Sequence, residues 1–96
     1  MKYFMNINDS SIISITDKAV HCEVEDEVVI LGLEDGVYYG LNPVGAFIWN
    51  MIQKSVSVAD IKKAVLDEYE VEEEVCDKDI KELLGDLKDR GLIEIS

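Results

Sequence analysis

The segment from Val37 to Trp49 constrains the fold more than any other stretch of this chain. It reads Val-Tyr-Tyr-Gly-Leu-Asn-Pro-Val-Gly-Ala-Phe-Ile-Trp and contains the only proline. The side chains of Val37–Leu41 alternate as in a strand whose residues point to opposite faces of a sheet. Asn42 is suited to cap a helix, and Pro43 is suited to its first position. The segment therefore predicts a strand that leads directly into a helix.

Two further strands are predicted before this junction. Ala19–Val24 alternates weakly, and Val28–Leu33 is a continuous apolar run rich in β-branched residues. The sequence Glu-Asp-Gly at 34–36 follows, with Gly36 where a hairpin loop needs a positive φ. The second strand and Val37–Leu41 are thus expected to form an antiparallel hairpin.

Three helices are predicted after the junction. The first follows Asn42, with apolar residues at helical spacing, and the second begins at Ser57, where Asp60 completes a capping-box pattern. The third begins near Glu72 and ends before Gly91, a typical C-terminal glycine. Leu92–Ile95 either adds a short strand or packs on the core. Six residues are assigned to that core: Phe47, Ile48, Trp49, Ile61, Val65 and Leu87.

The domain organisation follows from this order. The first 18 residues are mostly polar around the short apolar run Ile12–Ile15, so residues 1–18 are predicted to be a flexible N-terminal arm with one possible strand. Residues 19–96 are predicted to form one domain of the α+β class, with a three-stranded antiparallel sheet followed by three helices.

The charge excludes several classes of partner. Among 96 residues there are 21 acidic and 9 basic side chains, giving a net charge of −12. Nucleic-acid binding requires clustered basic residues, so nucleic acid and anionic membranes are poor partners. No apolar run approaches the length of a membrane span, and the N-terminal residues lack the apolar stretch of a signal peptide. A cytoplasmic location is expected.

The pattern of residues gives little support for a catalytic function. His21 is the only histidine, and in a strand it points to the face opposite Cys22. Cys22 and Cys76 are far apart and are expected to be free thiols that act as small apolar residues. The acidic residues between 72 and 79 do not follow a calcium-loop pattern and instead suit the start of a helix. No catalytic residue, cofactor or metal is therefore predicted.

Binding is the remaining function. A small sheet has edges, and an unpaired edge accepts an extended peptide as an added strand. Val37–Leu41 is the candidate edge, and its tyrosines offer a large contact area. The alternative is that Tyr38 and Tyr39 only cover the core. An exposed edge also permits a homodimer.

Several blocks of this sequence closely resemble the PqqD family. They are Tyr39-Gly-Leu-Asn-Pro-Val-Gly-Ala-Phe-Ile-Trp49, Ser57-Val-Ala-Asp-Ile61, Glu68-Tyr69-Glu-Val71, and the third-helix residues Asp79-Ile80, Leu83-Leu84, Leu87 and Arg90-Gly-Leu92. The resemblance extends from about Val20 to Ile93.

The resemblance implies a winged-helix-like fold and a function. Members of the family are RiPP recognition elements, which bind the leader segment of a ribosomally made precursor peptide and present it to a modifying enzyme. That enzyme is a radical-SAM protein, as in PQQ biosynthesis, or a leader peptidase, as in lasso-peptide maturation. The resemblance implies a non-catalytic adaptor, with a somewhat closer likeness to the lasso-type members.

The resemblance also implies a binding mode. The leader lies as an added strand against Val37–Leu41, in a cleft closed by the third helix. Which flank of that helix faces the strand stays open at this point. The expected peptide-binding residues are Val37, Tyr38, Tyr39, Gly40, Leu41, Cys76, Asp77, Ile80, Lys81, Leu84 and Lys88.

Two other classes of function compete with this one. A winged-helix DNA-binding regulator would have a similar set of helices, but its recognition helix would be basic. A small redox enzyme would use Cys22 or Cys76.

Overall fold

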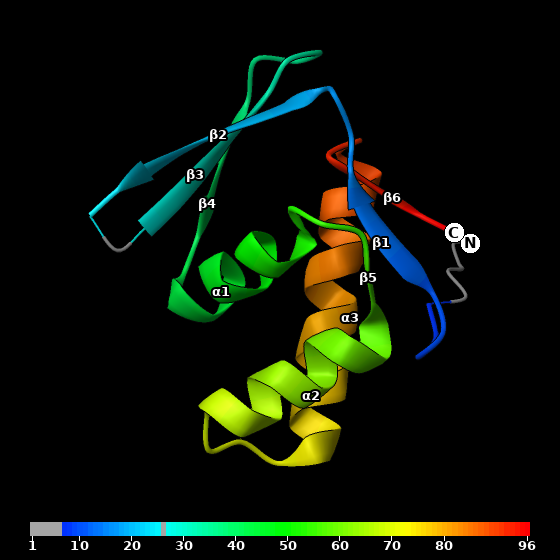
Figure 1. The fold of residues 1–96 in the computed structure, drawn as a ribbon. Coiled ribbons are helices and arrows are strands. Elements are labelled where there is room, and N and C mark those ends of the chain that lie inside the picture. Colours follow the sequence, from blue (N-terminus) through cyan, green and yellow to red (C-terminus); the bar gives the residue numbers. More distant parts are fainter. Residues whose placement is uncertain (1–6, 26) are drawn as a thin grey trace.

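The computed structural model describes residues 7–25 and 27–96, and its elements are arranged as two small sheets around three helices (Figure 1). Residues 1–6 of the expected arm lie outside the described residues. The elements in chain order are β1 (Ile12–Ile15), β2 (Ala19–Val24), β3 (Glu27–Gly32), β4 (Tyr38–Leu41), α1 (Pro43–Ile52), β5 (Val56–Ser57), α2 (Val58–Glu68), α3 (Glu73–Asp89) and β6 (Ile93–Ile95).

The first sheet has the antiparallel order β2-β3-β4 and confirms the predicted three-stranded unit. The loop between β3 and β4 contains Gly36 at φ 69°, the positive angle that its position in the sequence predicts. Asp35 supports this loop, because its Oδ1 accepts a hydrogen bond from the Val37 N–H at 3.0 Å. α1 lies against this sheet (Figure 1).

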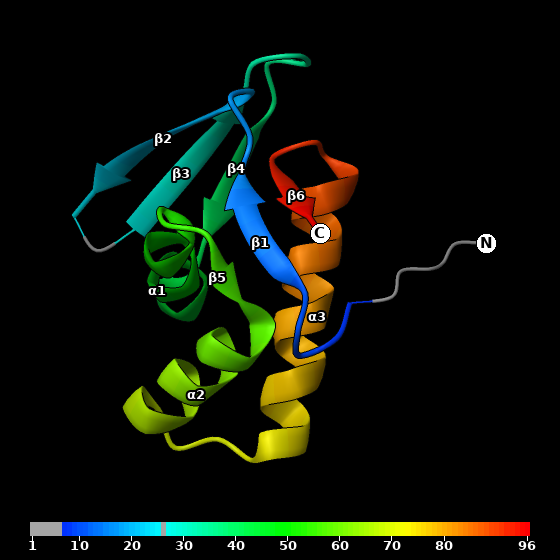
Figure 2. The same cartoon turned by 45° about the vertical axis from the view of Figure 1, so that its right-hand side comes forward.

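The second sheet has the order β5-β1-β6, and it corrects part of the predicted arm. Residues 12–15 form the central strand β1 between two strands from later in the chain (Figure 2). Ile13 lies opposite both Val56 and Ile95 and is fully buried. The possible strand within the predicted arm is present as β1, so residues 12–15 are not part of a flexible arm. Their strand partners lie more than 40 residues away in the chain, and the local sequence does not identify them.

The helix ends confirm the predicted capping residues. The Gly45 N–H donates to Asn42 Oδ1 at 2.8 Å at the start of α1, and the Asp60 N–H donates to Ser57 Oγ at 3.1 Å at the start of α2. α3 ends before Gly91, which has φ 74°. For Leu92–Ile95 the sequence allowed either a short strand or simple packing on the core, and the structure contains the strand β6 there.

The core lies where the three helices meet the two sheets. Trp49, Ile61 and Leu87 are fully buried, as predicted, and Phe47 is half-buried against the core. Among the described residues, no helix combines the length and the apolar character required to cross a lipid bilayer.

Candidate functional site

β4 is an edge strand. The order β2-β3-β4 gives it one strand neighbour among the described residues, so its other edge carries backbone groups with no strand partner. Such an edge is a template on which an extended chain can form a further strand. This confirms the predicted position of the strand at the sheet edge, with its start at Tyr38 in place of Val37.

Two residues turn their backbone groups toward this free edge. The Gly32 N–H donates to Val37 O at 3.0 Å, so Val37 faces β3. Along an antiparallel strand, successive residues direct their N–H and C=O groups alternately to one side and the other. Tyr38 and Gly40 therefore direct their backbone groups away from β3.

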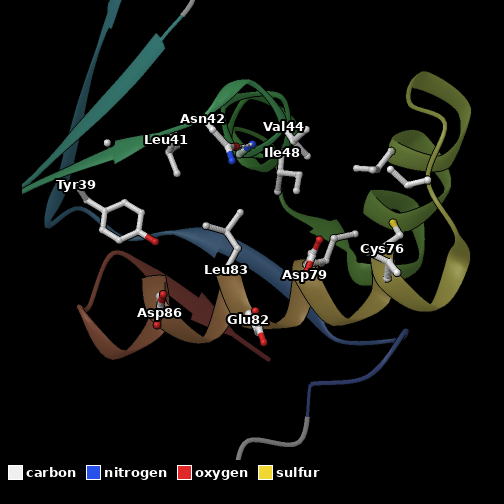
Figure 3. A pocket seen from close by; sticks show the side chains of 16 residues that line it. Tyr39, Leu41, Asn42, Val44, Ile48, Cys76, Asp79, Glu82, Leu83 and Asp86 are labelled. Carbon is white, nitrogen blue, oxygen red and sulfur yellow. Dashed lines mark hydrogen bonds between the residues drawn. The ribbon is translucent and has the colours of Figure 1, made fainter.

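A cavity of about 390 Å³ lies beside this strand, between β4, α1 and α3. Figure 3 shows Tyr39 at one end of it, Cys76 at the other and Leu83 between them. The lining is mostly apolar, with carboxylates contributed by α3. The lining residues are Tyr39, Gly40, Leu41, Asn42, Val44, Gly45, Ile48, Val65, Val71, Val75, Cys76, Asp79, Ile80, Glu82, Leu83 and Asp86.

The turn from β4 into α1 forms one wall of this cavity. The Asn42 cap ends the strand and starts the helix within one residue. Gly45 permits the close packing of the turn, because a Cβ there would lie 3.1 Å from Leu41 Cδ2 and 3.3 Å from Asn42 Oδ1. The apolar residues of α1, Val44 and Ile48, consequently reach the cavity.

Two charged side chains, Arg90 and Asp86, lie near the ring of Tyr39 at its end of the cavity. Arg90 Cζ lies 4.7 Å from the ring centroid, at the distance of a cation–π contact. Burial is the main cause that raises the pKa of the Tyr39 hydroxyl, and the negative charge of Asp86 raises it further. The positive charge of Arg90 acts in the opposite direction.

The structure brings five of the predicted residues to the cavity: Tyr39, Gly40, Leu41, Cys76 and Ile80. Val37 and Tyr38 are not part of its lining. Tyr38 is 68% exposed, so it does not cover the core, whereas Tyr39 packs against the core and also lines the cavity.

The other predicted residues of α3 lie outside the cavity. Lys62 Nζ of α2 is 3.1 Å from Asp77 Oδ1, and Lys81 Nζ is 3.1 Å from Asp77 Oδ2. These hydrogen-bonded ion pairs, first with Lys62 and then with Lys81, lower the pKa of Asp77. Leu84 is fully buried in the core, and Lys88 is exposed and does not line the cavity. The flank named in the prediction therefore faces α2 and the core.

The sequence left open which flank of α3 faces β4, and the flank that lines the cavity was not among the predicted binding residues. Its members Asp79, Leu83 and Asp86 follow a helical spacing, a signal present in the sequence but equally present for the other flank. The remaining residues missed lie on α1, on α2, between α2 and α3, and on α3: Asn42, Val44, Gly45, Ile48, Val65, Val71, Val75 and Glu82.

The residues considered for catalysis are not arranged as a reactive site. The ring centroids of His21 and Trp49 are 5.9 Å apart in an edge-to-face contact. Cys22 is exposed, so it does not act as a buried apolar residue, whereas Cys76 is buried and its burial raises the pKa of the thiol. Within residues 7–25 and 27–96, no group of three or more potential ligands could hold a metal ion.

Comparison with known proteins identifies similar sequences and folds. The family model described as coenzyme PQQ synthesis protein D (PqqD) matches residues 27–93. No curated protein sequence matches this chain.

Two solved structures share the fold over most of the chain. TbiB1 in complex with the TbiA(beta) leader peptide has 33% sequence identity and a TM-score of 0.79, covering 84% of this chain and 94% of that one. Lasso peptide synthetase B1 complexed with the leader peptide has 27% identity and a TM-score of 0.76, covering 85% and 96%.

Proposed function

This chain belongs to the PqqD family, and we propose that it is a non-catalytic adaptor that binds the leader segment of a ribosomally made precursor peptide. The leader pairs with the free edge of β4 as an added antiparallel strand. It then passes over the cavity between β4, α1 and α3. The observation that carries this proposal is the free edge of β4 beside an apolar cavity.

The two similar solved structures support this function. Both were solved with a leader peptide bound, and both cover more than four fifths of this chain. The DNA-binding alternative is not supported, because the open flank of α3 carries three carboxylates that would repel phosphate groups.

The partners follow from the same proposal. One of the two solved relatives is named as a lasso peptide synthetase, which favours a lasso precursor and a leader peptidase over a radical-SAM enzyme. The protein acts in the cytoplasm, where ribosomes make the precursor. The domain that carries this function comprises residues 19–96, supported by β1 from the preceding segment.

The binding residues in this proposal are those of the β4 edge and of the cavity. Tyr38 and Gly40 supply main-chain hydrogen bonds, and Tyr39, Leu41 and Ile80 contact apolar side chains of the leader. Of the residues predicted from the sequence, Asp77, Lys81 and Leu84 act indirectly, by holding α3 in place.

A substitution at Gly40 tests the docking edge. Gly40→Pro removes an N–H that faces away from β3, and proline is tolerated on an edge strand in that orientation. The loss of this hydrogen bond and the bulk of the ring are expected to weaken leader binding by about tenfold or more. The measurement is a titration of ¹⁵N-labelled protein with a synthetic leader peptide, followed by the shifts of its amide resonances.

Gly40→Ala is the matched control. It keeps the N–H, and its added Cβ would meet no atom within 4 Å. It should therefore bind the leader as the unchanged protein does, with shifts of the amide resonances along β4 and α3. Equal affinity of the proline and alanine variants, both folded, would show that the leader does not add to β4.

A further inference from the structure

The wall that α3 contributes to the cavity is acidic. Asp79, Glu82 and Asp86 all line it, all three are exposed, and no lysine or arginine is among the lining residues. None of the three forms an ion pair within the described part of the chain. Asp77, on the opposite flank, is by contrast paired with both Lys62 and Lys81.

The carboxylates form a row that runs along the cavity. Asp86 lies seven positions after Asp79 in the chain, which corresponds to a rise of about 10 Å along a helix. Side chains on one face of an extended peptide repeat every 6.6 to 6.8 Å or so. The row is therefore about as long as a stretch of added peptide that has two or three side chains on one face.

Apolar groups lie beside this row. Leu83 comes from the same helix, and Leu41 and Val44 come from β4 and α1 (Figure 3). A lysine or arginine side chain can lay its methylene groups on such a surface while its charged end reaches a carboxylate. A purely apolar peptide would cover the carboxylates without supplying a partner, which is unfavourable.

Arg90 forms a cation–π contact with the lining residue Tyr39 at the end of the cavity. Arg90 lies over the ring of Tyr39, beyond Asp86 on the same helix, and it is not part of the lining. Arg90 therefore leaves Asp79 and Glu82, which lie farther along the row, available to a ligand.

We propose that the groove selects a basic amphipathic strand, in which the face turned toward α3 combines apolar side chains with lysine or arginine. Asp79, Glu82 and Asp86 are then the residues that determine specificity. This inference rests on the proposed function, because it assumes that an extended peptide occupies the groove.

Three synthetic peptides of equal length test the inference. Each has apolar residues at alternate same-face positions, and the intervening same-face positions carry lysine, glutamine or glutamate. Fluorescence anisotropy at low salt is expected to give an order of affinity lysine, glutamine, glutamate, with about tenfold between the first and the last. The ratio should fall toward one near 1 M salt, where the screening length is about 3 Å.

A triple variant shows whether the three carboxylates cause the preference. Asp79→Asn, Glu82→Gln and Asp86→Asn together should bring the affinities for the lysine and glutamate peptides close to each other. The matched control is Glu23→Gln, Glu27→Gln and Glu94→Gln, exposed residues outside the cavity whose replacement changes the net charge equally. This control should keep the preference.

The outcomes separate this inference from the proposed function. If all three peptides bind with equal affinity, the charge preference is wrong and the peptide-binding function stands. If the control variant loses the preference as fully as the cavity variant does, overall charge and not the α3 row is responsible, which also overturns the inference. If no peptide binds and the cognate leader does not bind either, the proposed function itself fails.

Discussion

Tyr39 connects the sheet edge to the charges of α3. It belongs to β4, its ring lines the cavity and packs against the core, and the Arg90 guanidinium lies over the ring. The raised pKa means that the folded protein favours the neutral phenol. Deprotonation of this hydroxyl should therefore weaken both the fold and the cavity wall.

The pH dependence of stability tests this environment. Because the pKa of Tyr39 is raised above 10.0, the native state keeps a proton that the unfolded state loses. The contribution of Tyr39 is expected to be complete below about pH 10 and to be lost as the pH rises through the folded pKa. Urea denaturation at several alkaline pH values measures it, with Tyr39→Phe as the variant that lacks this loss.

Two neighbouring substitutions check the cause. Asp86→Asn removes a negative charge and should lower the pKa of Tyr39 toward its ordinary value, whereas Arg90→Gln should raise it. Ultraviolet titration of the tyrosinate signal follows both. A native Tyr39 that ionises at or below pH 10.0 would contradict this account.

Single residues with local roles were predictable from the sequence. Gly36, Asn42 and Gly91 have the backbone angles or hydrogen bonds that their sequence contexts predict. Each role involves partners only a few residues away along the chain, so the sequence contains all the participants. Cys22 is exposed, contrary to the expectation that it acts as a small apolar residue. Its exposure depends on what covers the outer face of the sheet, which the local sequence does not show.

The element α3 has two functional flanks, and the structure assigns them different roles. One flank carries Asp77, which Lys62 of α2 and Lys81 hold in place. The other carries Asp79 and Asp86 toward the cavity. Both flanks are acidic and adjoin the same apolar stripe, so the helix sequence alone does not distinguish them. The packing of α3 against α2 and the core decides which flank faces the cavity.

Removing Asp77 should loosen the contact between α2 and α3. Asp77→Asn is expected to lower the free energy of unfolding by up to about 1 kcal/mol at neutral pH, since the pairs are partly exposed. The pKa of Asp77 is lowered in the folded state, so its contribution is present above pH 3.8 and is lost as the pH falls through the folded pKa. Denaturation at neutral and acidic pH measures the difference.

Glu74→Gln is the comparison for this variant. Glu74 is on the first turn of the same helix, is exposed and has no ion pair among the described residues. Its substitution should change stability less. A pH-independent effect of Asp77→Asn would indicate that the ion pairs are not its cause.

The whole molecule depends on a second sheet that joins its two ends. β1 lies between β5 and β6, so the N-terminal segment is part of the same structure as the last residues of the chain (Figure 2). β6 of this sheet packs against α3. It therefore supports the helix that forms one wall of the cavity.

A substitution in β1 tests this dependence. Ile13 is fully buried, so Ile13→Ala should lower the free energy of unfolding by about 2 to 5 kcal/mol. Ile12 is 38% exposed, and Ile12→Ala should cost much less. Urea denaturation of the two variants measures the difference. Equal and small effects would mean that β1 does not contribute to the core.

The sequence by itself determined the local elements of this protein and the position of the edge strand β4. The strand, cap and helix between Val37 and Trp49 depend on side-chain alternation, hydrogen-bonding groups and backbone angles that act within a few residues. The same segment carries much of the family resemblance. The composition was sufficient to argue against a nucleic-acid partner.

Only the tertiary structure decided the pairing of β1 and the flank of α3 that lines the cavity. β1 joins residues such as Ile13 and Ile95, which are distant in the chain. The cavity combines β4 with the flank of α3 that carries Asp79, because Lys62 and the core occupy the other flank. These contacts depend on how complete elements pack together, and the pattern of any one element is compatible with more than one packing partner.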